Sequence, residues 1–248
     1  MIELKNKEQI QIMRRAGAIV AETLETLRGM VRPGVTTGEL DRVAEDYIVK
    51  QGATPAFKGY EGFPATICAS VNEEVVHGIP GTRKLCEGDI ISIDCGAFYR
   101  GYCGDSAITV PVGEIEPERR RLLEVCAQAL LLGIAQARPT QRLYDISHAV
   151  QSHVEENGMS VVRDYVGHGI GRQMHEDPKV PNFGRPGRGP RLARGMTIAI
   201  EPMVNLGGYQ VETLSNNWTV ATVDRRPSAH FEHTVVITED GPEILTKV

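Results

Sequence analysis

The stretch Gly88-Asp89-Ile90-Ile91-Ser92-Ile93-Asp94 recurs later in the chain as Gly195-Met196-Thr197-Ile198-Ala199-Ile200-Glu201, an offset of 107 residues. Both stretches are apolar and β-branched, so each predicts a buried strand that ends in an acid. Two pairs of helix-ending residues recur at an offset of 106, Pro33 with Pro139 and Gly52 with Gly158. The chain is therefore predicted to be one domain over 1–248, built from two similar halves at about 1–110 and 111–248.

The helical periodicity gives each half the same order of elements. Apolar residues at helical spacing predict a helix over residues 7–30 and another that ends near Gly52. Thr36 and Glu39 have the spacing of a capping box at the start of the second helix. In the other half, Pro117 begins a helix that ends before Pro139, and a further helix ends near Gly158. The expected fold class is α/β (α+β), with helix, helix and antiparallel strands in each half.

Four acids occupy positions where acids are rare. Asp94, Asp105, Glu201 and Glu232 all lie in or beside apolar strand segments, and none of these segments contains Lys or Arg. Removing an unpaired carboxylate from water costs several kcal/mol. A turn at Arg100-Gly101 would place Asp94 and Asp105 across from each other on neighbouring strands, where like charges repel. A bound divalent metal is the natural partner for the four acids, and the sequence predicts a metalloenzyme.

Composition excludes several other classes. A net charge of -5 gives no reason to expect DNA binding, and no run reaches membrane-spanning length. The five cysteines are odd in number and form no Cys-x-x-Cys, which argues against a disulfide framework. An N-terminus without an apolar signal core agrees with a cytoplasmic location.

Three histidines are candidate site residues, one just after an apparent strand and two in loops bounded by glycine or proline. His168 lies between Gly167 and Gly169, and with four unpaired acids nearby we interpret it as a metal ligand. His77 and His175 have no carboxylate partner obvious from the sequence, but such loops are the usual place for catalytic side chains. The alternative for both is a surface imidazole.

Asp94, Asp105, His168, Glu201 and Glu232, in that order, form the ligand pattern of the methionine aminopeptidases, and the chain resembles the short bacterial-type (type 1) members. The resemblance covers essentially all 248 residues. It rests on the strings VHGIP at 76–80, GHGIG at 167–171, HEDP at 175–178, IEPM at 200–203 and EHT at 232–234. It implies the pita-bread fold, a pseudo-twofold duplication, and a catalytic peptidase domain. Only 31 residues separate Glu201 from Glu232, so the large insertion of type 2 enzymes is absent.

The resemblance also implies two-metal hydrolysis. Two divalent ions about 3.5–4 Å apart share a water, lower its pKa and polarise the scissile carbonyl. Asp94 would chelate one ion, His168 and Glu201 would bind the other, and Asp105 and Glu232 would bridge the pair. Glu201 would also shuttle the proton, His77 would bind near the scissile amide, and His175 would steady the carbonyl. This ligand set suits Mn, Co, Fe or Zn.

A methionine side-chain pocket and a cation site follow from the same resemblance. The matching pocket positions are Phe57, Tyr60, Phe63, Cys68, Met174 and Trp218, each of which has ordinary core packing as its alternative. The chain departs from the usual pattern twice, with Phe63 in place of Tyr and Met174 in place of Phe. Asn72 and Ser228 match positions near a monovalent-cation site.

The expected activity is removal of the initiator methionine from nascent proteins whose second residue is small. The expected partners are N-terminal Met peptides, nascent chains and the ribosome, and the enzyme is expected to be a monomer. Two alternatives stay open at this point. One is a proline-specific peptidase of the same fold, although those relatives carry an extra N-terminal domain, and the other is a non-catalytic binding module that has kept the fold.

Overall fold

The computed structural model describes residues 1–247 and contains four α-helices in this range. They are α1 (Lys7–Met30), α2 (Thr37–Lys50), α3 (Pro117–Ala135) and α4 (Leu143–Glu156), with a short 3₁₀ helix, η1, at Tyr60–Gly62. As predicted, Thr36 and Glu39 form a capping box at the start of α2. None of the described helices is long and apolar enough to cross a membrane.

The central sheet has nine strands and is antiparallel in every described pair. Its order is β1-β4-β5-β14-β9-β7-β8, with β2 pairing β4 and β15 pairing β14. The strands are β1 (Thr54–Pro55), β2 (Ile67–Val71), β4 (Ile90–Tyr99), β5 (Tyr102–Pro111), β7 (Gly167–Gly169), β8 (Glu176–Val180), β9 (Thr197–Ile200), β14 (Glu232–Ile237) and β15 (Pro242–Ile244).

Two small three-stranded sheets lie beside the central one. The first has the order β13-β10-β6 and the second β11-β12-β3. Their strands are β3 (Glu74–Val76), β6 (Ser160–Val161), β10 (Met203–Asn205), β11 (Val211–Thr213), β12 (Val220–Thr222) and β13 (Ser228–His230).

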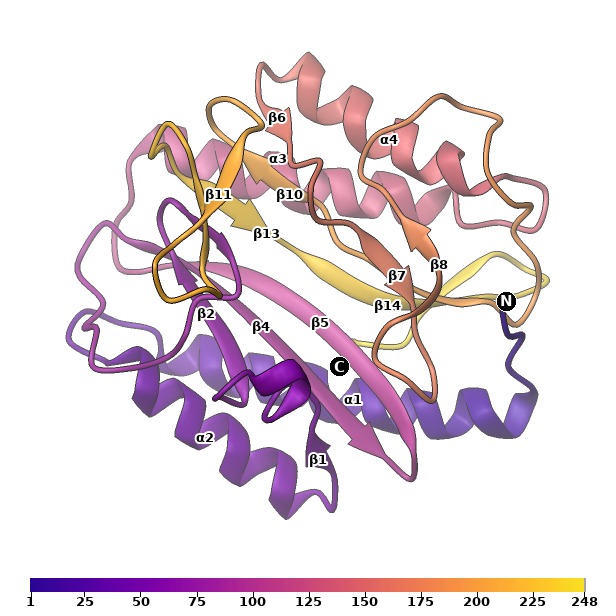
Figure 1. Ribbon diagram of the computed structural model, residues 1–248, viewed down its shortest axis with the longest axis horizontal. Coiled ribbons are helices and arrows are strands. Elements are labelled where there is room, and N and C mark those ends of the chain that lie inside the picture. Colours follow the sequence, from indigo (N-terminus) through magenta and orange to yellow (C-terminus); the bar gives the residue numbers. More distant parts are fainter. Residues whose placement is uncertain (248) are drawn as a thin grey trace.

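Several elements of the two predicted halves lie at the same offset in the sequence. The first and last residues of α2 and α4 are both separated by 106 positions, and β9 begins 107 residues after β4. In the sheet, the order β4-β5-β14-β9 places equivalent strands symmetrically about the β5–β14 pair. Figure 1 shows α1 and α2 at the bottom and α3 and α4 at the top, with the long strands between them. The mixed α/β architecture with its antiparallel sheet confirms the predicted fold class.

The packing of β4 determines which way its acid points. Ile91 and Ile93 belong to the core cluster that also contains Ile19 and Leu24 of α1. Because successive strand residues face opposite sides of a sheet, Asp94 lies on the face away from α1. Burying the isoleucines against the helices therefore directs the carboxylate to the opposite face of the sheet, where it lines a cavity.

Candidate metal centre and active site

Three of the four strand acids form a compact group on one face of the sheet. Asp94 and Glu232 both pair with Ala107, one from each side, and Asp105 lies two residues from Ala107 on the same face. The small Ala107 side chain thus lies in the middle of three carboxylates. Burial on the sheet brings together acids that are up to 138 residues apart in the sequence.

The predicted pairing of the two aspartates was wrong by two residues. The turn at Arg100-Gly101 forms as predicted, with both residues in the left-handed region, φ 46° and 78°. It pairs Tyr99 with Tyr102, so Asp105 stands opposite Gly96 and Asp94 is its diagonal neighbour. A Cβ at Gly96 would lie 2.8 Å from the Phe57 ring and 3.3 Å from Asp105 Oδ1. Glycine at this position therefore leaves room for the carboxylate.

The backbone around His168 fixes its tautomer. His168 Nδ1 lies 2.9 Å from the carbonyl oxygen of Gly169, and a carbonyl can only accept, so Nδ1 carries the proton. Nε2 is then free as a ligand atom. The glycines on either side of His168 allow the backbones of neighbouring strands to approach closely. A Cβ at Gly167 or Gly169 would lie 2.4 or 2.1 Å from backbone oxygens of neighbouring strands.

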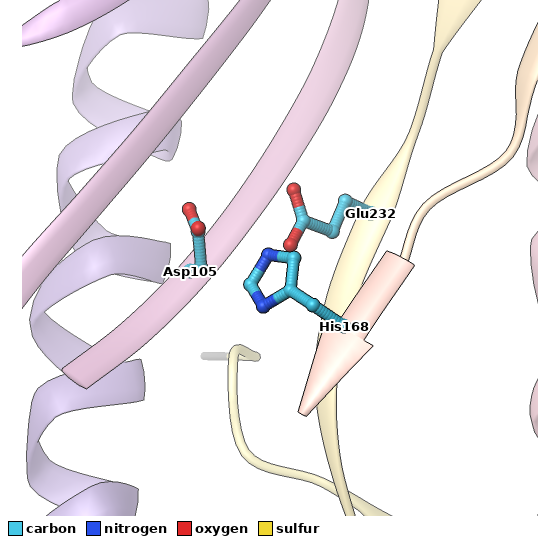
Figure 2. A group of neighbouring side chains, drawn as sticks. All are labelled: Asp105, His168 and Glu232. Carbon is cyan, nitrogen blue, oxygen red and sulfur yellow. The ribbon is translucent and has the colours of Figure 1, made fainter. Parts of the chain in front are cut away.

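The ligand atoms of three residues converge. One atom each from Asp105, His168 and Glu232 lies within 4.8 Å of the others, and Figure 2 shows the three side chains pointing toward one another from β5, β7 and β14. Glu201, which directly follows β9, joins them because its Oε1 lies 3.5 Å from His168 Nε2. These positions suit a cation held between carboxylates and one imidazole.

The carboxylates have no internal partner that would balance their charge. Asp94 Oδ1, Asp105 Oδ1 and Glu232 Oε1 are sealed from solvent without a hydrogen bond, and within residues 1–247 no lysine or arginine forms an ion pair with them. Burial raises the pKa of Asp105 to about 7. It also raises the pKa values of Asp94, Glu201 and Glu232 well above their ordinary range, aided by repulsion from neighbouring acids. Buried, unpaired carboxylate oxygens of this kind fit a divalent metal ion that binds carboxylates together with an imidazole.

All thirteen side chains selected from the sequence line one cavity of about 250 Å³. The metal-ligand candidates lie on one side of it. The pocket candidates Phe57, Phe63, Cys68 and Met174 are buried in one apolar cluster, against which Trp218 packs. The rings of Phe63 and Trp218 meet edge to face at 5.1 Å. An apolar, sulfur-lined recess therefore adjoins the acid group.

Tyr60 differs from the other pocket candidates. It is 36% exposed, and its hydroxyl lies 2.9 Å from His175 Nδ1. The His175 ring in turn meets the His168 ring edge to face at 4.3 Å. With Nδ1 occupied by the hydroxyl, Nε2 of His175 is the nitrogen left to face the cavity. Tyr60 thus fixes the orientation of the His175 ring in addition to lining the pocket.

His77 is held by an unusual backbone. It has φ 59°, in the left-handed region, and its ring packs edge to face on Tyr165 at 5.4 Å. Burial, aided by nearby His175, lowers the pKa of His77 to about 4. Burial likewise lowers the pKa of His175. Both imidazoles are therefore neutral near pH 7 and able to donate one N–H each.

The cavity also contains residues that sequence reasoning missed. They are Glu61, Val76, Tyr165, Val166, Met203 and His230. His230 is the most polar of the buried ones, and it stands two residues before Glu232. Its place beside a suspected ligand was the only signal in the sequence that could have identified it.

Asn72 and Ser228 are neighbours, as the predicted monovalent-cation site requires. The Ser228 N–H donates to the Asn72 carbonyl oxygen at 2.9 Å. The Asn72 side chain bonds to Asp89 at 2.8 Å and contacts the Arg119 guanidinium through Oδ1. A cation at this place would therefore depend on backbone carbonyls, and the site stays a prediction.

A family model, curated sequences and a solved structure all relate the chain to the same group of peptidases. The family model of Metallopeptidase family M24 matches residues 11–239. The chain is 56% identical over 248 residues to a methionine aminopeptidase of Clostridium perfringens and 57% identical over 248 residues to methionine aminopeptidase 1 of Bacillus subtilis, with 100% of each chain covered. Its structure is similar to the crystal structure of a methionine aminopeptidase from Thermotoga maritima, with a TM-score of 0.99, 47% identity and 100% of both chains covered.

Proposed function

The chain belongs to metallopeptidase family M24, among the methionine aminopeptidases, and from this premise we propose that it removes the initiator methionine from nascent chains whose second residue is small. The observation that carries the proposal is the joining of an apolar, sulfur-lined recess to a group of unpaired buried acids in one cavity. The full-length similarity to methionine aminopeptidases favours this activity over a proline-specific peptidase. The complete set of five ligand candidates argues against a non-catalytic module.

Five side chains would hold two divalent ions. Asp94 would hold one ion and His168 and Glu201 the other, and Asp105 and Glu232 would help to hold both. The ions supply Lewis acidity, which polarises a carbonyl and makes water more acidic. Four carboxylates and one imidazole suit Mn, Co, Fe or Zn. The support for this assignment is the set of sealed, unbonded oxygens of Asp94, Asp105 and Glu232.

Different side chains would transfer the proton and bind the substrate. Glu201, which lines the cavity beside the other ligand candidates, would take a proton from water and pass it to the leaving amine. His77 binds near the scissile amide. His175, held at Nδ1 by Tyr60, directs Nε2 toward the substrate carbonyl oxygen. The recess formed by Phe57, Phe63, Cys68, Met174 and Trp218 receives the methionine side chain.

The setting of the reaction is a further part of the proposal. We place it in the cytoplasm, on chains emerging from the ribosome, with the enzyme acting as a monomer. The described structure has all five cysteines free, four of them buried, as a reducing compartment permits. A monovalent cation near Asn72 and Ser228 would bind backbone carbonyls.

A peptide assay tests the function. The protein, supplied with Mn, Co, Fe or Zn in turn, is expected to release Met from Met-Ala-Ser and to act more slowly on Met-Leu-Ser. It should leave an Ala-Pro peptide intact. Cleavage of Ala-Pro alone would indicate a proline-specific peptidase, and no cleavage with any metal would indicate a binding module.

Met174 offers a test of the methionine recess. Its side chain is buried beside Phe57 and Phe63, and a flexible thioether makes a less rigid wall than an aromatic ring. Met174→Phe is expected to raise the preference for Met over norleucine or Leu at the cleaved position, with little change in metal content. One methylene contributes about 1–3 kcal/mol of discrimination. The measurement is the ratio of kcat/KM values for paired tripeptides, and an unchanged ratio would remove Met174 from the recess.

A further inference from the structure

His230 is a buried histidine beside the candidate ligands that the proposed function leaves without a role. It ends β13, and its side chain is 2% exposed. Its backbone is held at two points by one hydroxyl. The His230 N–H donates to Thr109 Oγ1 at 2.9 Å, and Thr109 Oγ1 donates to the His230 carbonyl at 2.8 Å. Since the main chain is fixed, the imidazole has a defined place in the cavity.

The imidazole faces two carboxylates. Its Nε2 lies 3.9 Å from Glu201 Oε2 and 4.0 Å from Glu232 Oε2. This nitrogen is sealed from solvent and has no hydrogen-bond partner among the described residues. Buried polar atoms are nearly always bonded, so an unbonded nitrogen between two acceptors calls for an explanation.

We propose that His230 is a positioning residue, whose Nε2–H donates to the carboxylates of Glu201 and Glu232 in the metal-loaded enzyme. Ionised carboxylates only accept hydrogen bonds, and a neutral imidazole carries one N–H, so the nitrogen facing them must be the protonated one. Closing from 3.9 Å to hydrogen-bond length requires a movement of about 1 Å. This inference rests on the proposed function, in which Glu201 and Glu232 are ligands.

The geometry favours a positioning role over a sixth ligand. The five proposed ligands already form a complete set, and His230 reaches it through two of their carboxylates, with Nε2 at 3.9 Å from Glu201 Oε2 and 4.0 Å from Glu232 Oε2. Outer partners of metal ligands set the orientation of the ligand side chains, and their loss typically costs about 10–100-fold in metal affinity or activity. His230 would act in this way on Glu201, the proposed proton carrier, and on Glu232, the shared ligand.

Two substitutions of similar size test whether His230 acts as an N–H donor or only fills space. His230→Gln keeps an N–H group, whereas His230→Leu fills the space without a donor. For His230→Leu we expect Mn²⁺ affinity, measured by calorimetry on the full-length protein, to fall by about 10–100-fold. The kcat on Met-Ala-Ser should fall with little change in KM. His230→Gln should restore most of both quantities, and the exposed His148→Leu is the matched control.

The Tm of the metal-free protein distinguishes a positioning role from a packing role, because the two roles predict opposite effects of His230→Leu on it. In that state Nε2 has no partner, so His230→Leu should leave the Tm of the stripped protein unchanged or raise it. A lower Tm for the stripped variant would assign His230 to packing. Wild-type Mn²⁺ affinity in His230→Leu, or a His230→Gln variant as impaired as His230→Leu, would also overturn the inference. Failure of the wild-type protein to bind any divalent ion would instead overturn the proposed function.

Discussion

Removing the divalent metal from this protein with a chelator is expected to abolish methionine release and to lower the Tm, and added metal should restore both. Without a cation, Asp94, Asp105 and Glu232 keep sealed oxygens with no partner. A ligand present at 100 times its Kd stabilises the folded state by about 2.7 kcal/mol. For a chain of this size, that corresponds to a decrease of roughly 5–10 °C in Tm when the metal is removed. Calorimetric melting before and after removal, with metal content measured in parallel, checks the result.

The stripped protein should also lose stability as the pH rises. Asp105 has a folded pKa of about 7, well above the ordinary value near 4, so its contribution to stability is full below pH 4 and is lost as the pH rises through 7. The lowered pKa values of His77 and His168, about 4 each, act in the opposite sense below pH 6.5. Between pH 6.5 and 8 the histidines no longer oppose the effect of Asp105, so the Tm of the stripped protein should fall over this interval. Metal binding there should release protons.

A matched pair of variants controls for general effects of chelation. Asp105→Asn keeps the size of the side chain but removes a shared ligand, so it should lose metal and activity together. The exposed Asp240→Asn should change neither. An unchanged Tm after verified metal removal would show that the four carboxylates are not clustered as described.

Substitution of either loop histidine is expected to reduce kcat/KM by about 10²–10⁴-fold while leaving the metal content intact. The reason is that neither imidazole is among the five proposed ligands, and each is assigned a contact with the substrate instead. For His175 the substitution is His175→Ala. For His77 we choose His77→Asn as well as His77→Ala, because asparagine tolerates the left-handed backbone at φ 59° and separates backbone strain from loss of the imidazole.

Two further variants serve as a comparison and a control for the substitutions of His77 and His175. Tyr60→Phe removes the hydroxyl on His175 Nδ1 and should reduce kcat/KM by less than His175→Ala does. The exposed His148→Ala, on α4, should have no effect. If either loop-histidine variant loses stoichiometric metal, that histidine is a ligand and its assigned role is wrong.

Much of the fold followed from local patterns in the sequence. Helix ends depend on neighbouring residues, so the capping box at Thr36 and the prolines near residues 117 and 139 predicted α2, α3 and α4 closely. The β4–β5 turn likewise depends on two adjacent residues that adopt positive φ. The repeat of similar strings at a nearly constant offset predicted two equivalent halves, because duplicated segments fold into the same elements.

The ligand set could also be recognised from the sequence, for an energetic reason. An acid such as Asp94 or Glu201 at the end of an apolar strand is costly unless a cation is present, so its residue type in that context already indicates a partner. Neighbouring glycines and prolines made His77, His168 and His175 candidates, and the resemblance to the family then implied their roles. The roles of these residues remain proposals that rest on this reasoning.

What only the tertiary structure decided was how side chains from distant segments meet. The pairing of β5 with β14, which are far apart in the sequence, placed Glu232 opposite Ala107 and so beside Asp94 and Asp105. The bond between Tyr60 and His175 joins residues 115 positions apart, and no local pattern encodes it. His230 looks in the sequence like any strand histidine. Its unbonded nitrogen beside Glu201 and Glu232 exists only because β13, β14 and the segment after β9 pack together, and burial excludes the water that would otherwise satisfy it.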